Sequence, residues 1–236
     1  MDGLLNLYKP VGITSAKALY RVRRLIEQRK SGHAGTLDPA AEGVLVLCLG
    51  RATKLVERIM SLPKRYLAQA RLDVTSASFD SDRPLVPVPV ATPPTMAEVR
   101  AALSRFQGVI QQTPPVVSAI KVGGRPAYRL ERAGKPPVLS PRPARVDHIK
   151  LLQYEWPRIE FEVACGRGFY VRALIRDIGA ALNTGGCLTR LVRTAIGPFE
   201  IASAWRLEAL TESDAPGKAV IPIQAAIEMF ERDAGI

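Results

Sequence analysis

The chain has 236 residues, and 47% of them are hydrophobic, which is enough for a sizeable buried core and excludes a wholly disordered protein. No apolar run reaches the roughly 18 residues of a membrane span, and the N-terminus lacks the pattern of a signal peptide, so we expect a cytoplasmic protein with no membrane partner. The formal net charge of +11 indicates a polyanionic partner, with nucleic acid favoured over an anionic membrane surface.

The first part of the chain predicts alternating strands and helices. The expected elements are a strand over 3–10, a helix over 15–29, a strand over 44–49, a short helix over 52–60 and a strand over 65–72. The strand over 44–49 is apolar on both faces, which is typical of a central strand. The helix over 15–29 has arginines opposite its apolar side, a pattern that a basic binding face and an ordinary solvated face share.

A glycine-rich segment over 31–43 joins this basic helix to the apolar strand. Its three glycines and its proline predict a loop rather than a regular element. His33, Thr36 and Asp38 lie within it, and loops placed by a rigid scaffold often carry function, so it is the first candidate for chemistry. On composition alone, an ordinary turn before a strand is the simpler interpretation.

The rest of the chain continues the mixed pattern. The expected elements are a loop over 79–94, a helix from Thr95 to Gly108 with a capping box at Thr95 and Glu98, a strand over 116–122, a turn at 123–124, a basic helix over 126–134, strands over 144–156 and 159–165, a helix over 169–182, extended segments over 187–196 and 199–205, and a last helix over 224–232. Strands outnumber helices, and hairpins or irregular loops join most of them. We therefore predict an α+β fold, with residues 1–236 as a single monomeric domain.

The cysteines and histidines argue against a metal site. The three cysteines lie far apart without metal-type spacing, and two histidines are too few for a zinc cluster. We therefore expect no metal, and chemistry done by carboxylates, hydroxyls and arginines. The arginines fall in clusters rather than evenly along the chain, which strengthens the expectation of a nucleic-acid partner.

Four sequence blocks, in order along the chain, carry a family resemblance. They are Gly32-His33-Ala34-Gly35-Thr36-Leu37-Asp38-Pro39, Lys64-Arg65-Tyr66, residues 114–121, and Gly168-Phe169-Tyr170-Val171-Arg172 followed by residues 188–194. The N-terminal segment over 6–15 matches as well. With these blocks the sequence resembles the TruB family of tRNA pseudouridine synthases, from about residue 3 to residue 225.

The resemblance implies the pseudouridine synthase fold, with a mixed, mostly antiparallel central sheet flanked by helices and loops. It also implies the isomerisation of a uridine in the T loop of tRNA, at position 55, to pseudouridine. The bond between N1 and the ribose breaks and the uracil is rejoined through C5, so no cofactor is needed. Asp38 would be the nucleophile, attacking either the ribose C1′ or the uracil C6, and Arg172 would hold it charged and in place.

Other matching residues would surround the reacting base. Tyr66 would stack on the flipped uracil and assist removal of the C5 proton, although on pattern alone it is as readily a core aromatic of its strand. Tyr170 would line the same pocket, and Leu191 would supply an apolar wall. His33 would help to hold the target nucleotide out of the RNA helix. The tRNA phosphates would be held by Lys30, Arg125, Arg129, Arg132 and Arg193.

Two features depart from the family pattern. The family usually has Thr-Asp-Thr where this sequence has Ser76-Ala77-Ser78, so that aspartate is lost and Asp80 or Asp82 is the nearest substitute. Bacterial relatives usually continue into a small RNA-binding PUA domain, and the sequence up to Ile236 has no match to it. We therefore expect weaker contacts to the acceptor end of tRNA.

Two other functions compete with the isomerase. A non-catalytic RNA-binding protein or tRNA-folding chaperone has no use for a buried carboxylate beside a polyanion, so the set of Asp38, Tyr66 and Arg172 argues against it. A nucleoside hydrolase usually needs a metal or a second positioned carboxylate to activate water, and the sequence offers neither. The sequence therefore predicts a stand-alone tRNA uridine isomerase.

Overall fold

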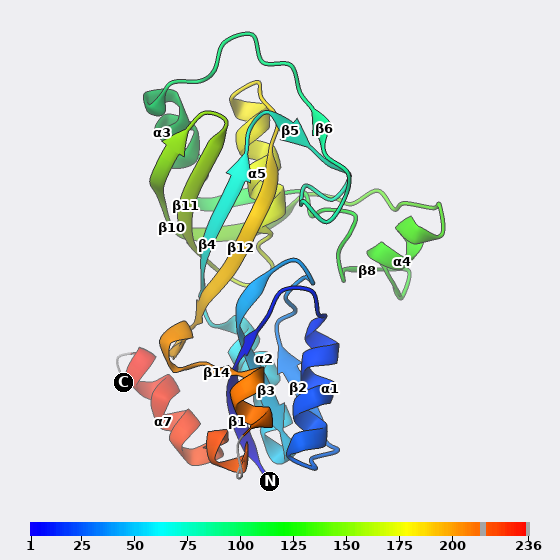
Figure 1. Ribbon diagram of the computed structural model, residues 1–236, viewed down its shortest axis with the longest axis vertical. Helices are drawn as coiled ribbons and strands as arrows, with labels where there is room; N and C mark the ends of the chain where they lie inside the picture. Colours follow the sequence, from blue (N-terminus) through cyan, green and yellow to red (C-terminus); the bar gives the residue numbers. More distant parts are fainter. Residues whose placement is uncertain (213–215, 235–236) are drawn as a thin grey trace. The chain divides into compact units, whose positions relative to one another are not determined.

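The computed structural model describes residues 1–212 and 216–234, which form two compact units (Figure 1). Unit 1 is drawn from Met1–Tyr66 and Leu191–Ile236, and unit 2 from Leu67–Arg190. Strands β4 (Lys64–Arg71) and β12 (Cys187–Ile196) run from one unit into the other. Each unit holds one part of an 11-stranded mixed sheet with helices packed on it, so the predicted α+β class is confirmed.

Unit 1 is built on a mixed sheet. Its strands lie in the order β14-β1-β3-β12, with β2 beside β3, β13 beside β12 and β15 beside β1. Most pairs are antiparallel, whereas β12 runs parallel to β3 and β14 runs parallel to β1. The strand bounds are β1 Gly3–Lys9, β2 Ser31–Ala34, β3 Glu42–Leu49, β13 Phe199–Glu200, β14 Trp205–Arg206 and β15 Ile221–Pro222.

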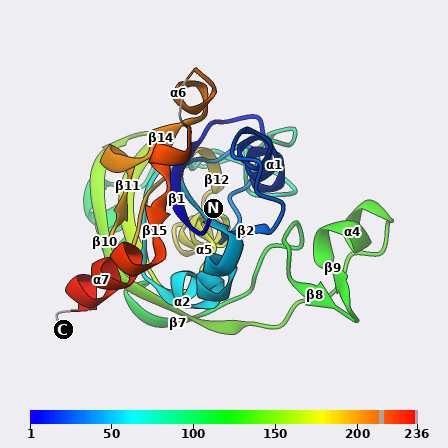
Figure 2. The same ribbon diagram turned by 90° about the horizontal axis from the view of Figure 1, so that it is seen from below.

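Helices cover both faces of this sheet. In Figure 2, β1 lies between α1 and α6 on one side and α2 and α7 on the other. Leu45 and Leu47 of β3 join the hydrophobic cluster under α1, while Val44, Val46 and Cys48 join the opposite cluster, so the prediction of a central strand is confirmed. The helix bounds are α1 Ser15–Leu25, η1 Gly50–Leu55, α2 Val56–Ser61, η2 Ile201–Ser203, α6 Leu207–Thr211, η3 Pro216–Ala219 and α7 Ile223–Ala234.

Unit 2 holds the rest of the same 11-stranded sheet, in which the strands continue in the order β12-β4-β11-β10-β7. Strand β10 pairs antiparallel with both β11 and β7. Two short hairpins, β5/β6 and β8/β9, form separate two-stranded sheets. The bounds are β5 Val74–Thr75, β6 Val86–Pro87, α3 Met96–Ser104, β7 Gly108–Gln112, β8 Lys121–Val122, β9 Arg125–Pro126, α4 Ala127–Arg132, β10 Arg142–Glu155, β11 Arg158–Cys165 and α5 Val171–Ala181. None of the helices in the described residues is long and apolar enough to cross a membrane.

Several predicted elements differ from the structure, and three of these differences concern the segments around the candidate site. The helix expected to reach Arg29 ends at Leu25, because Glu27 adopts a left-handed backbone with φ of 53°. Residues 31–34 were expected in a loop and instead form β2, since they pair with residues 46–49 of β3. Residues 116–120, expected to be a strand, lie outside any strand, and only Lys121–Val122 pairs, with Arg125–Pro126.

Candidate active site

The loop that carries Asp38 joins β2 to β3 in unit 1, and its backbone is fixed from the side of α1. The hydroxyl of Ser15, the first residue of α1, donates to the Leu37 carbonyl at 3.0 Å and accepts from the Leu37 N–H at 2.8 Å. The Gly12 N–H donates to the Pro39 carbonyl at 2.8 Å. Both neighbours of Asp38 in the chain are therefore held, while the carboxylate itself is only partly buried.

Arg193 on β12 holds the same loop from the opposite strand. Its side chain is 1% exposed, and its guanidinium donates to the carbonyls of Val44 at 2.8 Å, Gly35 at 3.0 Å and Thr36 at 3.4 Å. A guanidinium that is buried and already donates to three carbonyls presents no exposed edge to a phosphate. The burial of Arg193 therefore argues against the predicted contact with the tRNA backbone, and its hydrogen bonds show that it anchors the loop of Asp38.

Two glycines make this anchoring sterically feasible. Gly43 has a φ of 105°, and a Cβ added there would lie 2.3 Å from the Arg193 carbonyl. Gly35 has a φ of 90°, and its carbonyl is one of the acceptors of the guanidinium. Only glycine adopts these backbone angles without strain, so the glycines at these two positions of the segment over 31–43 reflect its close approach to β12.

Lys9 at the end of β1 is a second buried cation near Asp38, and no role was predicted for it. Its side chain is fully buried, and its ammonium donates to the carbonyls of Pro10 at 2.8 Å and Ile13 at 2.9 Å. Burial lowers the pKa of Lys9 to about 8, the negative charge of Asp38 opposes that shift, and the positive charge of Arg193 adds to it. The loop therefore lies among two buried cations.

The lowered pKa of Lys9 makes stability depend on pH. In the unfolded chain this lysine has an ordinary pKa of about 10.4. Between pH 8 and that value the unfolded chain therefore binds more protons than the folded chain. The free energy of unfolding should therefore rise across this window, by up to about 3 kcal/mol from Lys9, and stay level with respect to Lys9 below pH 8. Urea unfolding at pH 7.5 and pH 10 measures this rise in the free energy of unfolding. The rise should be absent in Lys9→Met and present in Lys54→Met, a control at an exposed position.

The other predicted residues of unit 1 lie around this loop or on the strands that adjoin it. His33 is on β2 opposite Leu47, and burial, together with the charge of Arg193, lowers its pKa. Its Nδ1 atom is buried without a hydrogen-bond partner among the described residues. Leu191 is buried on β12, one residue before the position that pairs with Glu42 at the end of the loop. Tyr66 is half-buried on β4.

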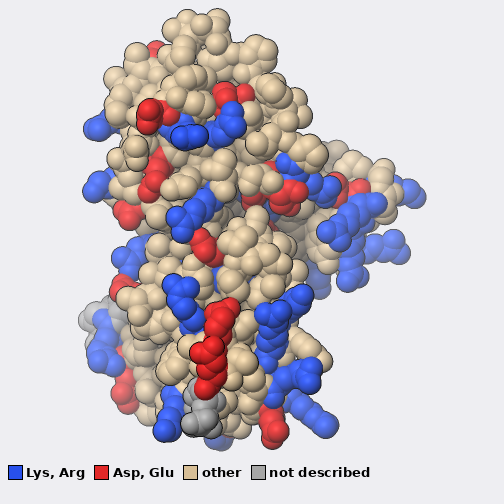
Figure 3. All heavy atoms as spheres, viewed as in Figure 1, with Lys and Arg blue, Asp and Glu red and all other residues tan. Residues whose placement is uncertain are grey.

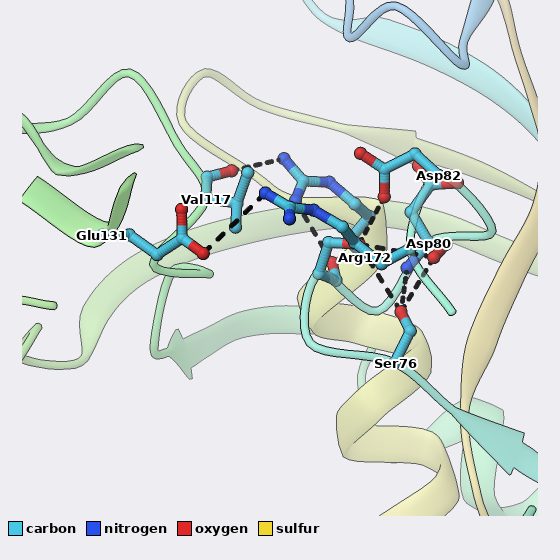
Figure 4. Close-up of polar contacts among 8 residues, drawn as sticks. Ser76, Asp80, Asp82, Val117, Glu131 and Arg172 are labelled. Carbon is cyan, nitrogen blue, oxygen red and sulfur yellow. Dashed lines mark hydrogen bonds and ion pairs between the residues drawn. The ribbon is translucent and has the colours of Figure 1, made fainter. Parts of the chain in front are cut away.

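In unit 2, Arg172 lies in the first turn of α5 and is buried. Its guanidinium donates to the carbonyls of Ser78 at 3.2 Å and Val117 at 2.9 Å (Figure 4). Tyr170 precedes the helix, and the buried amide of Gln112 binds both its backbone groups, accepting from its N–H at 2.9 Å and donating to its carbonyl at 3.1 Å. The sequence block over 114–121 therefore helps to hold the start of α5, a role that its residues did not suggest.

The carboxylate nearest in sequence to the lost family aspartate is buried in the same unit. Asp80 is 6% exposed, and the Ser76 hydroxyl donates to its carbonyl at 2.8 Å and accepts from its N–H at 3.0 Å. Asp82 is exposed and accepts from the Ser78 hydroxyl. Figure 4 shows both carboxylates in the turn that also supplies the Ser78 carbonyl to Arg172. Burial makes Asp80 the better candidate for the substitute.

The remaining basic residues are exposed, as a phosphate-binding role requires. Arg129 and Arg132 of α4 lie over the Tyr128 ring, at 6.0 and 5.7 Å from its centroid. Arg125 on β9 and Lys30 are also exposed. Figure 3 shows lysine and arginine side chains gathered over α4.

Two family descriptions match the chain in sequence. The TruB family pseudouridylate synthase N-terminal domain matches residues 23–171, and the tRNA pseudouridylate synthase B C-terminal domain matches residues 172–226. The chain belongs to the TruB family. The TruB resemblance of the motif blocks, and the expectation of an enzyme that follows from it, are confirmed.

Relatives and solved structures agree with the TruB assignment. The chain is 42% identical over 234 residues to tRNA pseudouridine synthase B of Mycobacterium tuberculosis (strain ATCC 25618 / H37Rv), covering 98% of this chain and 78% of the relative. It is 40% identical over 227 residues to the protein of that name from Clostridium kluyveri, covering 96% and 78%. The fold is also similar to that of a chain in a solved Cbf5-Nop10-Gar1 complex, with a TM-score of 0.74 and 28% sequence identity. The match covers 96% of the present chain and 62% of the chain in the complex. The pseudouridine synthase fold is therefore confirmed.

Proposed function

We propose that this TruB protein isomerises a T-loop uridine of tRNA, at position 55, to pseudouridine, with Asp38 as the nucleophile. The observation that carries the proposal is the loop of Asp38, whose backbone is bound on both sides of that residue by Gly12, Ser15 and Arg193. A nucleophile held on a fixed backbone needs little reorganisation to reach its target atom. The relatives named tRNA pseudouridine synthase B support tRNA as the substrate, and a tRNA substrate is consistent with the expected cytoplasmic location.

In this proposal Asp38 attacks the target nucleotide at the ribose C1′ or at the uracil C6, and both routes keep the same residue. The bond between N1 and C1′ breaks, the uracil turns and C5 bonds to C1′. The covalent bond to Asp38 breaks again, C5 loses its proton and N1 takes one up from solvent, so the product is an isomer of the substrate. Arg172 stabilises the carboxylate and the charge that develops on the base, since a guanidinium matches a carboxylate in charge and geometry. Asp80 has no place in the bond changes and serves to hold the surroundings of Arg172.

The base itself is recognised by apolar and aromatic contacts. Tyr66 stacks on the uracil and assists loss of the C5 proton, Tyr170 lines the pocket, and Leu191 gives it an apolar wall. His33 supports the extruded nucleotide, whose release from the stack costs a few kcal/mol. A lowered pKa keeps its imidazole neutral near pH 7, which suits packing against a base better than a second buried charge.

The phosphates are held by the exposed basic residues of unit 2 and by Lys30. Arg125, Arg129 and Arg132 present their charges on β9 and α4, around the ring of Tyr128. Contacts of this kind fix the register of the RNA and carry no sequence information. The residues proposed to bind the phosphates are therefore different from those proposed to take part in the reaction.

The test is release of tritium from a tRNA transcript labelled at C5 of its uridines. The wild-type protein should release about one label per tRNA, and digestion of the product should give an equal amount of pseudouridine. A transcript with cytidine in place of the target T-loop uridine should release none. Binding of tRNA without release would favour the RNA-binding protein, and free uracil in place of pseudouridine would favour the hydrolase.

A further inference from the structure

Helix α1 of unit 1 presents a basic surface for which the proposed chemistry has no use. Lys17, Tyr20, Arg21 and Arg24 are exposed and follow one another at i, i+3, i+4 and i+7, so they form one stripe along the helix. We call these four residues the α1 stripe. The buried residues of the helix, Ser15, Ala18 and Val22, lie outside the stripe and face the sheet.

The charges of the α1 stripe destabilise the helix when no partner is bound. The helix contains no aspartate or glutamate, so Lys17 and Arg21, four residues apart, repel each other without an acidic neighbour in the helix. Lys17 also lies in the first turn, where the helix dipole disfavours a cation. A surface that concentrates like charges in this manner is stabilised when a polyanion binds to it.

An aromatic ring lies within the stripe. Tyr20 is 50% exposed, and the guanidinium carbons of Arg23 and Arg24 lie 5.2 and 6.0 Å from its ring centroid. Arginine stacked on an exposed aromatic ring is typical of surfaces that bind RNA, because both groups offer a flat face as well as charge. Figure 3 shows lysine and arginine side chains gathered over α1.

The stripe begins beside the loop of Asp38. Ser15, which binds the backbone of Leu37, is two residues before Lys17, and at about 1.5 Å per residue the stripe extends roughly 10 Å along α1 from Lys17 to Arg24. An RNA duplex-like backbone offers several phosphate charges over that length. RNA whose target base reaches Asp38 therefore has phosphates within reach of this helix.

We propose that the α1 stripe binds the phosphate backbone of the RNA arm that carries the target uridine. The inference rests on the proposed function, and it adds a second phosphate-binding surface, on unit 1, to that of β9 and α4. Because phosphate contacts position the RNA without taking part in bond changes, the stripe should contribute to affinity and to the salt dependence of binding, and not to the chemical step.

The test uses the variant Lys17→Gln/Arg21→Gln/Arg24→Gln. Its matched control, Lys54→Gln/Arg100→Gln/Arg105→Gln, removes the same charge from exposed positions elsewhere. Binding is measured with a fluorescent T-arm stem-loop and with full-length tRNA over a series of salt concentrations, and kcat by tritium release. The α1 variant should bind both RNAs at least about 10-fold more weakly, and its slope of log Kd against log salt should fall by about one per residue removed.

The other readouts separate the proposal from its competitors. The kcat of the α1 variant should be unchanged and its melting temperature should not fall, because the removed charges repel one another, while the control should bind RNA as the wild type does. An effect equal to that of the control, or one seen with full-length tRNA alone, overturns the proposal. So does loss of binding to phosphatidylserine vesicles with unchanged RNA affinity, which would assign the stripe to a membrane surface. A wild-type protein that releases no tritium overturns the proposed function instead, and the binding series still tests the stripe.

Discussion

Replacing Asp38 with asparagine should abolish pseudouridine formation and leave the fold intact. The amide has nearly the shape of the carboxylate, but it lacks the charge and nucleophilicity that the proposed reaction needs. Loss of a nucleophile commonly lowers kcat by about 10⁴-fold or more. Single-turnover tritium release from labelled tRNA, with enzyme in excess, measures the chemical step without interference from product release.

Asp147→Asn is the matched control for this change. Asp147 is an exposed carboxylate on β10, paired with Arg145 at 2.8 Å, so its loss alters the net charge by the same amount. Its release rate should equal that of the wild type. Asp38→Ala guards against slow reversion of asparagine to aspartate, and both Asp38 variants should still bind tRNA. A variant that forms pseudouridine at an undiminished rate would remove Asp38 from the role of nucleophile and leave the enzyme assignment standing.

Elements whose signals are local could be predicted from the sequence. Thr95 and Glu98 satisfy each other's backbone groups at the start of α3, and the capping box that predicted this helix is present in the structure. Gly123 and Gly124 both have positive φ, as a tight turn between β8 and β9 requires. The continuous apolar run over 44–49 correctly predicted that β3 lies between two hydrophobic layers, because a strand buried on both faces has apolar residues at successive positions.

Elements that depend on a distant partner could not be predicted. Residues 31–34 look like part of a glycine-rich loop and become β2 only because β3 offers them a free edge. Residues 116–120 are rich enough in β-branched side chains to predict a strand, yet none forms there. Strand propensity is set largely by cross-strand neighbours, which a single sequence does not reveal.

The candidate site divides in the same way. Asp38 was predicted from its motif, and its loop proved to be held on both sides of that residue. Ser15 and Arg193, which hold this loop, lie in matching segments, but the sequence did not predict that they anchor it. Hydrogen bonds from a side chain to a backbone carbonyl leave no pattern in the sequence. Arg193 was predicted to contact the RNA because a basic residue on a strand is usually solvated, and only the structure reveals its burial, which argues for an anchoring role instead.

Arg193→Leu should destabilise the protein and slow the chemistry of the molecules that remain folded. The change leaves the carbonyls of Gly35, Thr36 and Val44 without the donor that Arg193 supplies, at a cost of about 1–3 kcal/mol for each that stays buried. We expect a loss of about 3 kcal/mol in the free energy of unfolding, measured in urea. With the loop less firmly held, kcat of the folded enzyme should fall by about 100-fold, since a displacement near 1 Å has effects of that size.

Two variants and one titration separate anchoring of the loop from general support of the fold. Arg190→Leu removes the same charge from an exposed position of the same strand and should leave kcat unchanged. Arg193→Lys keeps the charge but not the planar fork, so it should recover part of the stability and little of kcat. Because the charge of Arg193 lowers the pKa of His33, that pKa should rise in Arg193→Leu and stay constant in Arg190→Leu, with exposed His148 as the internal reference in an NMR titration. If instead kcat of folded Arg193→Leu matches the wild type while its stability falls, Arg193 supports the sheet and the loop of Asp38 is positioned from the side of Ser15 alone.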